Sequence, residues 1–151
     1  MTEFEGVLDA SDLRVGVVVA SWNQSITDRL LEAALDRLNT LGASDVTVLR
    51  VPGALEIPVA AAALARAGCH AIVAIGVVIK GETDHYEIVV RESTSGVSRV
   101  ALDTGVPIGN AILAVHDIDD ALARSGPGEA NKGAEAAGTA VMTATALRLL
   151  G

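Results

Sequence analysis

The sequence predicts an α/β protein: a three-layer α/β/α sandwich in which helices cover both faces of a four-stranded parallel sheet. Four runs rich in Val, Ile and Ala recur along the 151 residues, and continuous apolar runs are typical of strands buried on both faces. The segments between the runs are long enough for helices, and this alternation favours parallel pairing through right-handed crossovers. The length is that of a single domain, residues 1–151.

The expected strands are Val15–Ala20, Val46–Val51, Ala71–Ile79 and Ile108–Val115. Between the first two, apolar residues recur at helical spacing from Ile26 to Leu41, with Ser25 and Asp28 at cap-like positions and Gly42 as the stop. The later crossovers are expected to form the helices Pro58–Ala67, Thr83 to about Leu102, Asp117–Ser125 and Asn131–Leu150.

Composition narrows the classes of partner. The chain has 11 Lys and Arg against 19 Asp and Glu, a net charge of −8, which opposes binding to nucleic acid and to anionic membrane surfaces. The longest apolar run, Ala71–Ile79, is far shorter than the roughly 20 residues of a membrane span. The single cysteine, Cys69, excludes an internal disulfide and a thiol cluster for zinc, which fits the cytoplasm.

The share of apolar residues predicts an oligomer. Hydrophobic residues make up 50% of the chain and charged residues 20%. A small monomer has too much surface to bury so much apolar material, so part of it is expected to face another subunit.

Ligands of open parallel sheets bind beyond the carboxyl ends of the strands. Three loops there carry residues that a bare turn does not require: Ser21–Asn23, Pro52–Glu56 and Gly81–His85. Trp22 could stack on a planar heterocycle or fill the core. Glu56 could help to hold a ligand or could interact with the dipole at the start of a helix.

The third of these loops indicates an anion site. Gly81 allows close approach of the backbone, and the helix that follows opens with free N–H groups that attract phosphate. The alternative is that Thr83 or Asp84 only caps the helix. His85 stands beside this site, where an imidazole can transfer a proton in either direction, although a lone histidine is more often structural.

Cations are scarce, so the positions of Arg124 and Lys132 matter. The short helix that ends near Arg124 is expected to run back toward the amino ends of the strands. This places Arg124 at the edge opposite His85. Asn110, early in the fourth strand, and Lys132 are expected at the same edge, so that two subunits would be needed to bring both sets together, in a head-to-tail ring. The alternatives are helix-dipole pairing for Arg124 and a solvated side chain for Lys132.

With these motifs the sequence resembles the lumazine synthases, enzymes of riboflavin biosynthesis. The matching segments are Glu5-Gly6, Ser21–Asn23, Val51–Pro58, Gly76–Glu87 and Asn131–Gly133 with Glu135–Ala137. They cover nearly the whole chain in order and spacing. The departures are Trp22 in place of the usual Phe, Ala114-Val115-His116 where paired threonines are common, and Pro127-Gly128 where many relatives carry a Lys.

The resemblance implies a flavodoxin-like fold and a transferase reaction that uses neither a metal nor an organic cofactor. In this reaction 5-amino-6-(D-ribitylamino)uracil condenses with 3,4-dihydroxy-2-butanone 4-phosphate to give 6,7-dimethyl-8-ribityllumazine, phosphate and water. The implied pyrimidine and ribityl contacts are Trp22, Asn23, Ala54, Leu55, Glu56, Val77, Val78 and Ile79, with Asn110 and Lys132 from an adjacent subunit. The implied phosphate contacts are Gly81, Glu82 and Thr83 with a neighbour's Arg124, and His85 is the implied proton-transfer residue.

The resemblance also implies a homopentamer, or a multiple of it, in which the N-terminal segment joins the sheet of the neighbouring subunit. Riboflavin synthase is a further candidate partner. Two other functions remain open: an archaeal-type riboflavin synthase, which would leave the phosphate loop and Arg124 without a phosphorylated substrate, and a catalytically idle flavin-binding or shell-forming protein.

Overall fold

The four predicted strands form one parallel sheet in the order β2-β1-β3-β4. The computed structural model describes residues 1–128 and 130–151. The strands are β1 (Arg14–Ala20), β2 (Asp45–Val51), β3 (Ala71–Ile79) and β4 (Ile108–Val115). Each predicted strand is confirmed to within one residue at either end. The expectation of burial on both faces is wrong for β2, because it is an edge strand and most of its residues are exposed in the single chain.

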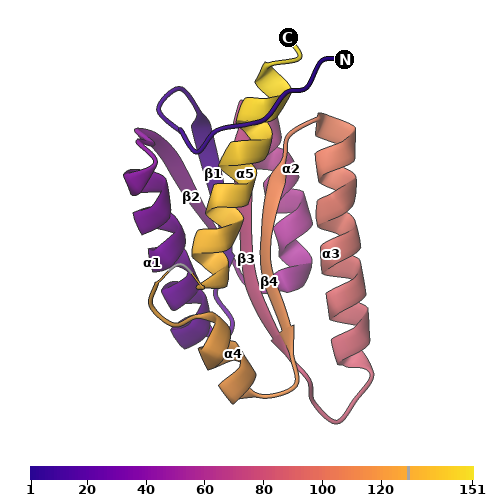
Figure 1. The fold of residues 1–151 in the computed structure, drawn as a ribbon. Coiled ribbons are helices and arrows are strands. Elements are labelled where there is room, and N and C mark those ends of the chain that lie inside the picture. The colour runs from indigo at the N-terminus through magenta and orange to yellow at the C-terminus, as the bar shows by residue number, and fades with distance from the viewer. Residues whose placement is uncertain (129) are drawn as a thin grey trace.

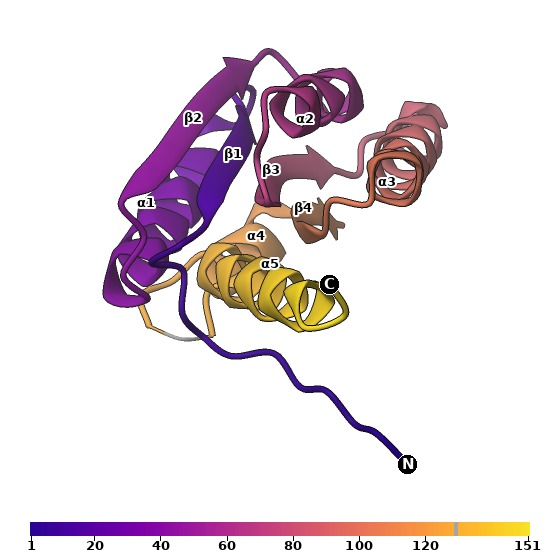
Figure 2. The same ribbon diagram turned by 90° about the horizontal axis from the view of Figure 1, so that it is seen from above.

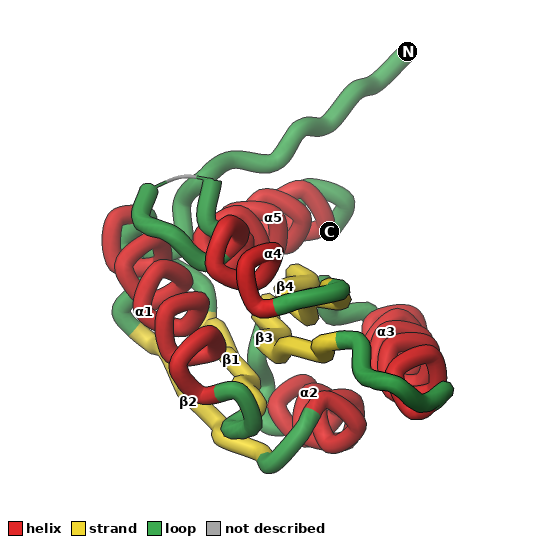
Figure 3. The backbone as a smooth tube through the Cα atoms, turned by 90° about the horizontal axis from the view of Figure 1, so that it is seen from below, coloured by secondary structure: helices red, strands yellow, loops and turns green. Residues whose placement is uncertain are grey.

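Helices cover both faces of this sheet, as the fold class requires (Figures 1 and 2). One face carries α1 (Gln24–Thr40), α4 (Ile118–Arg124) and α5 (Lys132–Arg148), and the other carries α2 (Ile57–Arg66) and α3 (His85–Thr104). A short 3-10 helix, η1 (Ala54–Glu56), precedes α2. Seen along the strands from below, α4 lies on the α5 side of β4 and α3 lies on the far side (Figure 3).

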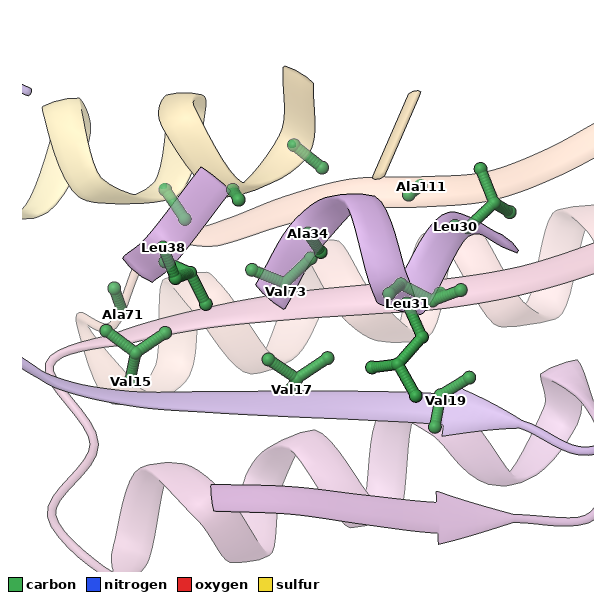
Figure 4. Close-up of a cluster of buried hydrophobic side chains, with 14 of the residues drawn as sticks. Val15, Val17, Val19, Leu30, Leu31, Ala34, Leu38, Ala71, Val73 and Ala111 are labelled. Atoms are coloured by element: carbon green, nitrogen blue, oxygen red, sulfur yellow. The ribbon is translucent and has the colours of Figure 1, made fainter. Parts of the chain in front are cut away.

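The core has two parts because successive side chains of a strand point to opposite faces. Val15, Val17 and Val19 of β1 pack with α1 and α5 (Figure 4), whereas Val18 packs on the face covered by α2. Helix α5 lies very close to α1: a Cβ at Gly133 would collide with the backbone carbonyl of Leu30. Only glycine permits this approach.

At the amino edge of the sheet, His70 forms two hydrogen bonds with the backbone of Arg14. His70 Nδ1 accepts a hydrogen bond from Arg14 N (2.8 Å), and His70 N donates to Arg14 O (2.7 Å). Burial, followed by the positive charges of Arg148 and Arg14, lowers the pKa of His70, and Asp45 opposes this shift. The imidazole therefore favours its neutral form in the folded protein.

Strand β2 is an open edge of the sheet. Val48 and Leu49 are exposed, and most other residues of the strand are exposed as well. The N-terminal segment does not cover this edge: it crosses α5, where the Thr145 hydroxyl accepts from Val7 N (2.8 Å), and then extends away from the body (Figure 2). No helix within residues 1–128 and 130–151 is both long and apolar enough to span a membrane.

Candidate functional site

The three loops predicted to share the carboxyl edge of the sheet do so, and two of them are joined by hydrogen bonds. Ser21 N donates to Val51 O (2.7 Å), and Trp22 N donates to Pro52 O (2.9 Å). The first loop also reaches β3, because Asn23 Nδ2 donates to Val77 O (3.3 Å). These bonds fix the loop after β1 between its two neighbours.

Asn23 holds the start of α1. Its backbone is left-handed (φ 62°, ψ 46°), and its carbonyl accepts from Ile26 N and Thr27 N. The expectation that Ser25 and Asp28 cap this helix is wrong, because the helix begins at Gln24 and Asn23 is the N-cap. Asparagine is one of the few residues that tolerate this conformation.

Trp22 does not belong to the core. Its side chain is 67% exposed, so the core-filling alternative is wrong. The ring lies against Gly53, which is buried beneath it. The indole is thus available to a ligand and has a defined support.

The loop after β2 is held by its own carboxylate. Glu56 Oε1 accepts from Gly53 N (3.1 Å) across the start of η1. This geometry agrees with the helix-start role weighed for Glu56, and it leaves the second carboxylate oxygen for a ligand. Ala54 is buried and Leu55 is exposed.

The end of β3 offers backbone groups. Pairing between β1 and β3 stops at Val19 and Ile75, whereas β3 continues to Ile79 beside β4. The side chains of Val77 and Val78 are buried on opposite faces of the sheet. Residues 77–79 can therefore meet a ligand chiefly through their backbone.

The loop from Gly81 to Asp84 is exposed throughout, and a Cβ at Gly81 would meet nothing within 4 Å. Thr83 Oγ1 accepts a long hydrogen bond from His85 N (3.4 Å), in keeping with the capping alternative. His85 is the first residue of α3 and is exposed. Glu82 is exposed in the same loop.

Sequence reasoning missed a contact beside His85. The rings of Tyr86 and His116 meet edge to face, with centroids 6.5 Å apart and an angle of 86° between the planes. The contact joins the start of α3 to the end of β4. The departure from paired threonines leaves capping intact, because Asp117 Oδ1 accepts from Asp120 N (2.9 Å) at the start of α4.

Arg124 does not lie at the amino edge, so that expectation is wrong. Helix α4 has seven residues and stays beside the carboxyl ends of the strands (Figure 1). Lys132 begins α5 next to Gly133, which packs against the second turn of α1. What separates these two residues from His85 is the sheet: they lie on the α1 face, and α3 lies on the other.

Arg124, Lys132 and Asn110 already have hydrogen-bond or ion-pair partners within the chain. Arg124 Nη1 donates to Asp120 O (3.0 Å), and Lys132 Nζ pairs with Glu135 Oε2 (2.9 Å). Asn110 lies exposed on β4, and its Oδ1 accepts from Ile112 N (3.0 Å). One chain does not bring them into the loops around His85.

The described residues, 1–128 and 130–151, contain no cluster of three or more His, Cys, Asp or Glu side chains that could hold a metal ion. The site thus consists of an exposed indole, open backbone at the end of β3 and a glycine-containing loop before a helix. This arrangement is that of an α/β protein with a candidate small-molecule site at the carboxyl edge of its sheet.

The comparisons with known proteins give the family. The sequence profile described as 6,7-dimethyl-8-ribityllumazine synthase matches residues 12–148. Relatives carrying that name include proteins of Kineococcus radiotolerans, 49% identical over 93% of this chain and 89% of the relative, and Streptomyces avermitilis, 44% identical over 94% and 89%. Another, from Xanthomonas euvesicatoria pv. vesicatoria, is 43% identical over 99% of both chains. The chain belongs to the 6,7-dimethyl-8-ribityllumazine synthase family.

Proposed function

We propose that this protein condenses 5-amino-6-(D-ribitylamino)uracil with 3,4-dihydroxy-2-butanone 4-phosphate to form 6,7-dimethyl-8-ribityllumazine. The observation that carries the proposal is the family match over residues 12–148, which spans all three loops at the carboxyl edge. The reaction links an amine to a ketone with loss of one water, eliminates phosphate and closes a ring onto the resulting carbonyl with loss of a second water. Every step moves a proton, and the substrate carries its own leaving group, so positioning supplies much of the acceleration.

The pyrimidine is proposed to stack on Trp22 and to meet the backbone of residues 77–79. The exposure of the indole and the extension of β3 beyond β1 support this placement. The ribityl chain is proposed to run along Ala54, Leu55 and Glu56, where the free carboxylate oxygen can accept from its hydroxyl groups. Asn23 is proposed to support this site by holding the loop after β1 against β3, because its amide nitrogen already donates to Val77 O.

The phosphate is proposed to bind Gly81, Glu82 and Thr83 at the start of α3, together with Arg124 of a neighbouring subunit. Backbone N–H groups at a helix N-terminus attract an anion, and a guanidinium adds a charge-assisted contact. His85 is proposed to transfer protons beside this anion. Its exposure at the first turn of α3 supports this role.

A site that needs both His85 and Arg124 fits a second subunit, since α3 and α4 lie on opposite faces of the sheet within one chain. We propose a pentamer or a multiple of five, in which the neighbour also supplies Asn110 and Lys132. The open edge of β2 and the extended N-terminal segment support pairing between the segment of one copy and the sheet of the next. A cytoplasmic location is proposed because Cys69 is a free, buried thiol.

The activity is tested by mixing the protein with the aminopyrimidine and the butanone phosphate, while lumazine absorbance and inorganic phosphate are followed together. Equal rates of lumazine formation and phosphate release are expected. Conversion of lumazine to riboflavin without the phosphorylated substrate would identify a riboflavin synthase. Binding without turnover would identify an idle homologue.

The shared site is tested by subunit mixing. His85→Ala and Arg124→Ala chains are expected to be weakly active alone and more active after joint refolding, because some interfaces then hold both native residues. Native mass spectrometry measures the subunit number. A fully active monomer, or no gain on mixing, would show that each chain contains a complete site.

A further inference from the structure

The indole of Trp22 is exposed and yet has a fixed seat. Trp22 N donates to Pro52 O (2.9 Å), so the backbone that carries the ring is tied to the loop that carries Gly53. A Cβ built at Gly53 would lie 2.5 Å from Trp22 Cε3 and 2.6 Å from Cζ3. The six-membered part of the indole therefore rests on the backbone of Gly53.

Nothing in the local backbone requires glycine here. Gly53 is extended (φ −133°, ψ −179°), a conformation open to any residue. Its N–H donates to Glu56 Oε1 (3.1 Å), which any residue other than proline could do. The three atoms nearest to a Cβ at this position all belong to Trp22. The absence of a side chain at Gly53 therefore leaves room for the indole in its observed position.

We propose that Gly53 is a positioning residue that sets the Trp22 indole as the fixed wall of the pyrimidine site. A planar ring stacks best on a surface already held in place, because less freedom is then lost on binding. A methyl group at position 53 displaces the indole from its seat. The link to catalysis rests on the proposed function, whereas the seat itself is a property of the free protein.

The obstacle at Gly53 is a side chain that can move, unlike the obstacle at Gly133. Trp22 is 67% exposed and has room to rotate away, whereas a Cβ at Gly133 meets the backbone of Leu30. Gly53→Ala is therefore expected to fold and to shift the ring. Gly138→Ala is the matched control, because a Cβ there meets only ordinary contacts, the nearest to Leu8 at 3.7 Å and Arg37 at 3.8 Å.

The first test uses the fluorescence of Trp22, the one tryptophan of the chain. In the free protein, Gly53→Ala is expected to shift the emission maximum and to change acrylamide quenching, while Gly138→Ala leaves both as in the wild type. Unchanged emission and quenching in Gly53→Ala would overturn the proposal. This measurement needs no substrate and stands even if the wild type forms no lumazine, an outcome that would refute only the proposed function.

The second test is kinetic. Gly53→Ala is expected to raise the KM for the aminopyrimidine about 2- to 10-fold, the worth of one aromatic stacking contact, with the KM for the butanone phosphate unchanged. In a Trp22→Ala background the same change should add nothing, because no indole remains to be displaced. An equal added effect in that background would show that Gly53 acts by another route.

Folding of the two variants gives a last check. If Gly53→Ala unfolds and Gly53→Ala with Trp22→Ala folds, the collision with the indole is still the cause. If both unfold, the glycine serves the fold and the proposal is wrong. Thermal unfolding followed by circular dichroism measures both.

Discussion

The site is built from two halves that the fold holds in different ways. Residues 21–23 are tied to Val51, Pro52 and β3, and Gly53 is tied to Glu56, by hydrogen bonds of 2.7–3.3 Å. Residues 81–84 are exposed, and the Thr83 hydroxyl there accepts one long bond of 3.4 Å. In the proposed site, the wall for a flat ring is set in advance, and the anion loop is left for the ligand and a neighbouring subunit to order.

The largest effect on activity is expected in the open half of the site, the exposed loop of residues 81–84 and the start of α3. His85→Ala should lower kcat roughly 10- to 10³-fold, because general acid–base catalysis contributes up to about 10⁴ and water substitutes in part. The melting temperature should stay close to that of the wild type, since His85 is exposed. Unchanged kcat and an unchanged pH profile would limit His85 to a structural role and move proton transfer to water or the substrate phosphate.

Arg124→Ala tests whether the open half is completed from outside. The KM for the butanone phosphate should rise roughly 10- to 100-fold, because a charge-assisted contact is worth about 1.5–3 kcal/mol. The KM for the aminopyrimidine should change little. Steady-state kinetics with each substrate varied in turn measures the split, and equal rises would indicate that Arg124 supports the fold through Asp120.

In the other half of the site, the hydrogen-bonded loops after β1 and β2, substitutions should change the stability of the fold. Asn23→Ala is expected to lower the free energy of unfolding by about 1–2 kcal/mol, from alanine strain in the left-handed conformation and loss of the bond to Val77 O. Chemical denaturation measures the change. Gly81→Ala is the control in the open half, because its Cβ meets nothing within 4 Å. Equal losses in the two variants would remove the distinction between the halves.

The smallest effect lies far from both halves, at the amino edge. Folding lowers the pKa of His70, so the unfolded chain binds more protons and stability falls as the pH drops below about 6.5. His70→Asn keeps an acceptor for Arg14 N without titrating, so it should lose less stability between pH 7.5 and 5.5. Melting temperatures at the two pH values measure this, and turnover should be unaffected. An equal loss in both proteins would assign the pH dependence to other groups.

The sequence predicts the strands well, and it predicts the Asp117 cap of α4 but not the N-cap of α1, for a physical reason. Buried apolar runs such as Ala71–Ile79 carry their own limits, since burial on both faces demands apolar residues throughout. The N-cap Asn23 could not be found in this way, because it combines a left-handed backbone with a side-chain bond to Val77 O of β3, which only the folded chain brings near. The local sequence pattern favours Ser25 as the N-cap of α1, whereas in the folded protein the N-cap is Asn23.

The positions of the loops were predictable from parallel topology, but their contacts were not. The rule for carboxyl edges places Trp22 and Glu56 near one another without showing that both meet at Gly53. Arg124 was misplaced for a related reason: residue count does not show that the seven residues of α4 stop near the carboxyl edge. The meeting of Tyr86 with His116 likewise needs the folded backbone.

The attachment of the N-terminal segment to α5 sets a length scale for assembly. Gly6 packs against Met142, and Val7 is tied at Thr145 near the C-terminal end of α5, so residues 1–5 form a short tether beyond that point. An extended chain spans at most about 3.6 Å per residue, which gives this tether a reach of about 18 Å. In the proposed pairing with β2 of a neighbouring copy, residues 1–5 can meet only the part of that edge that lies within this radius.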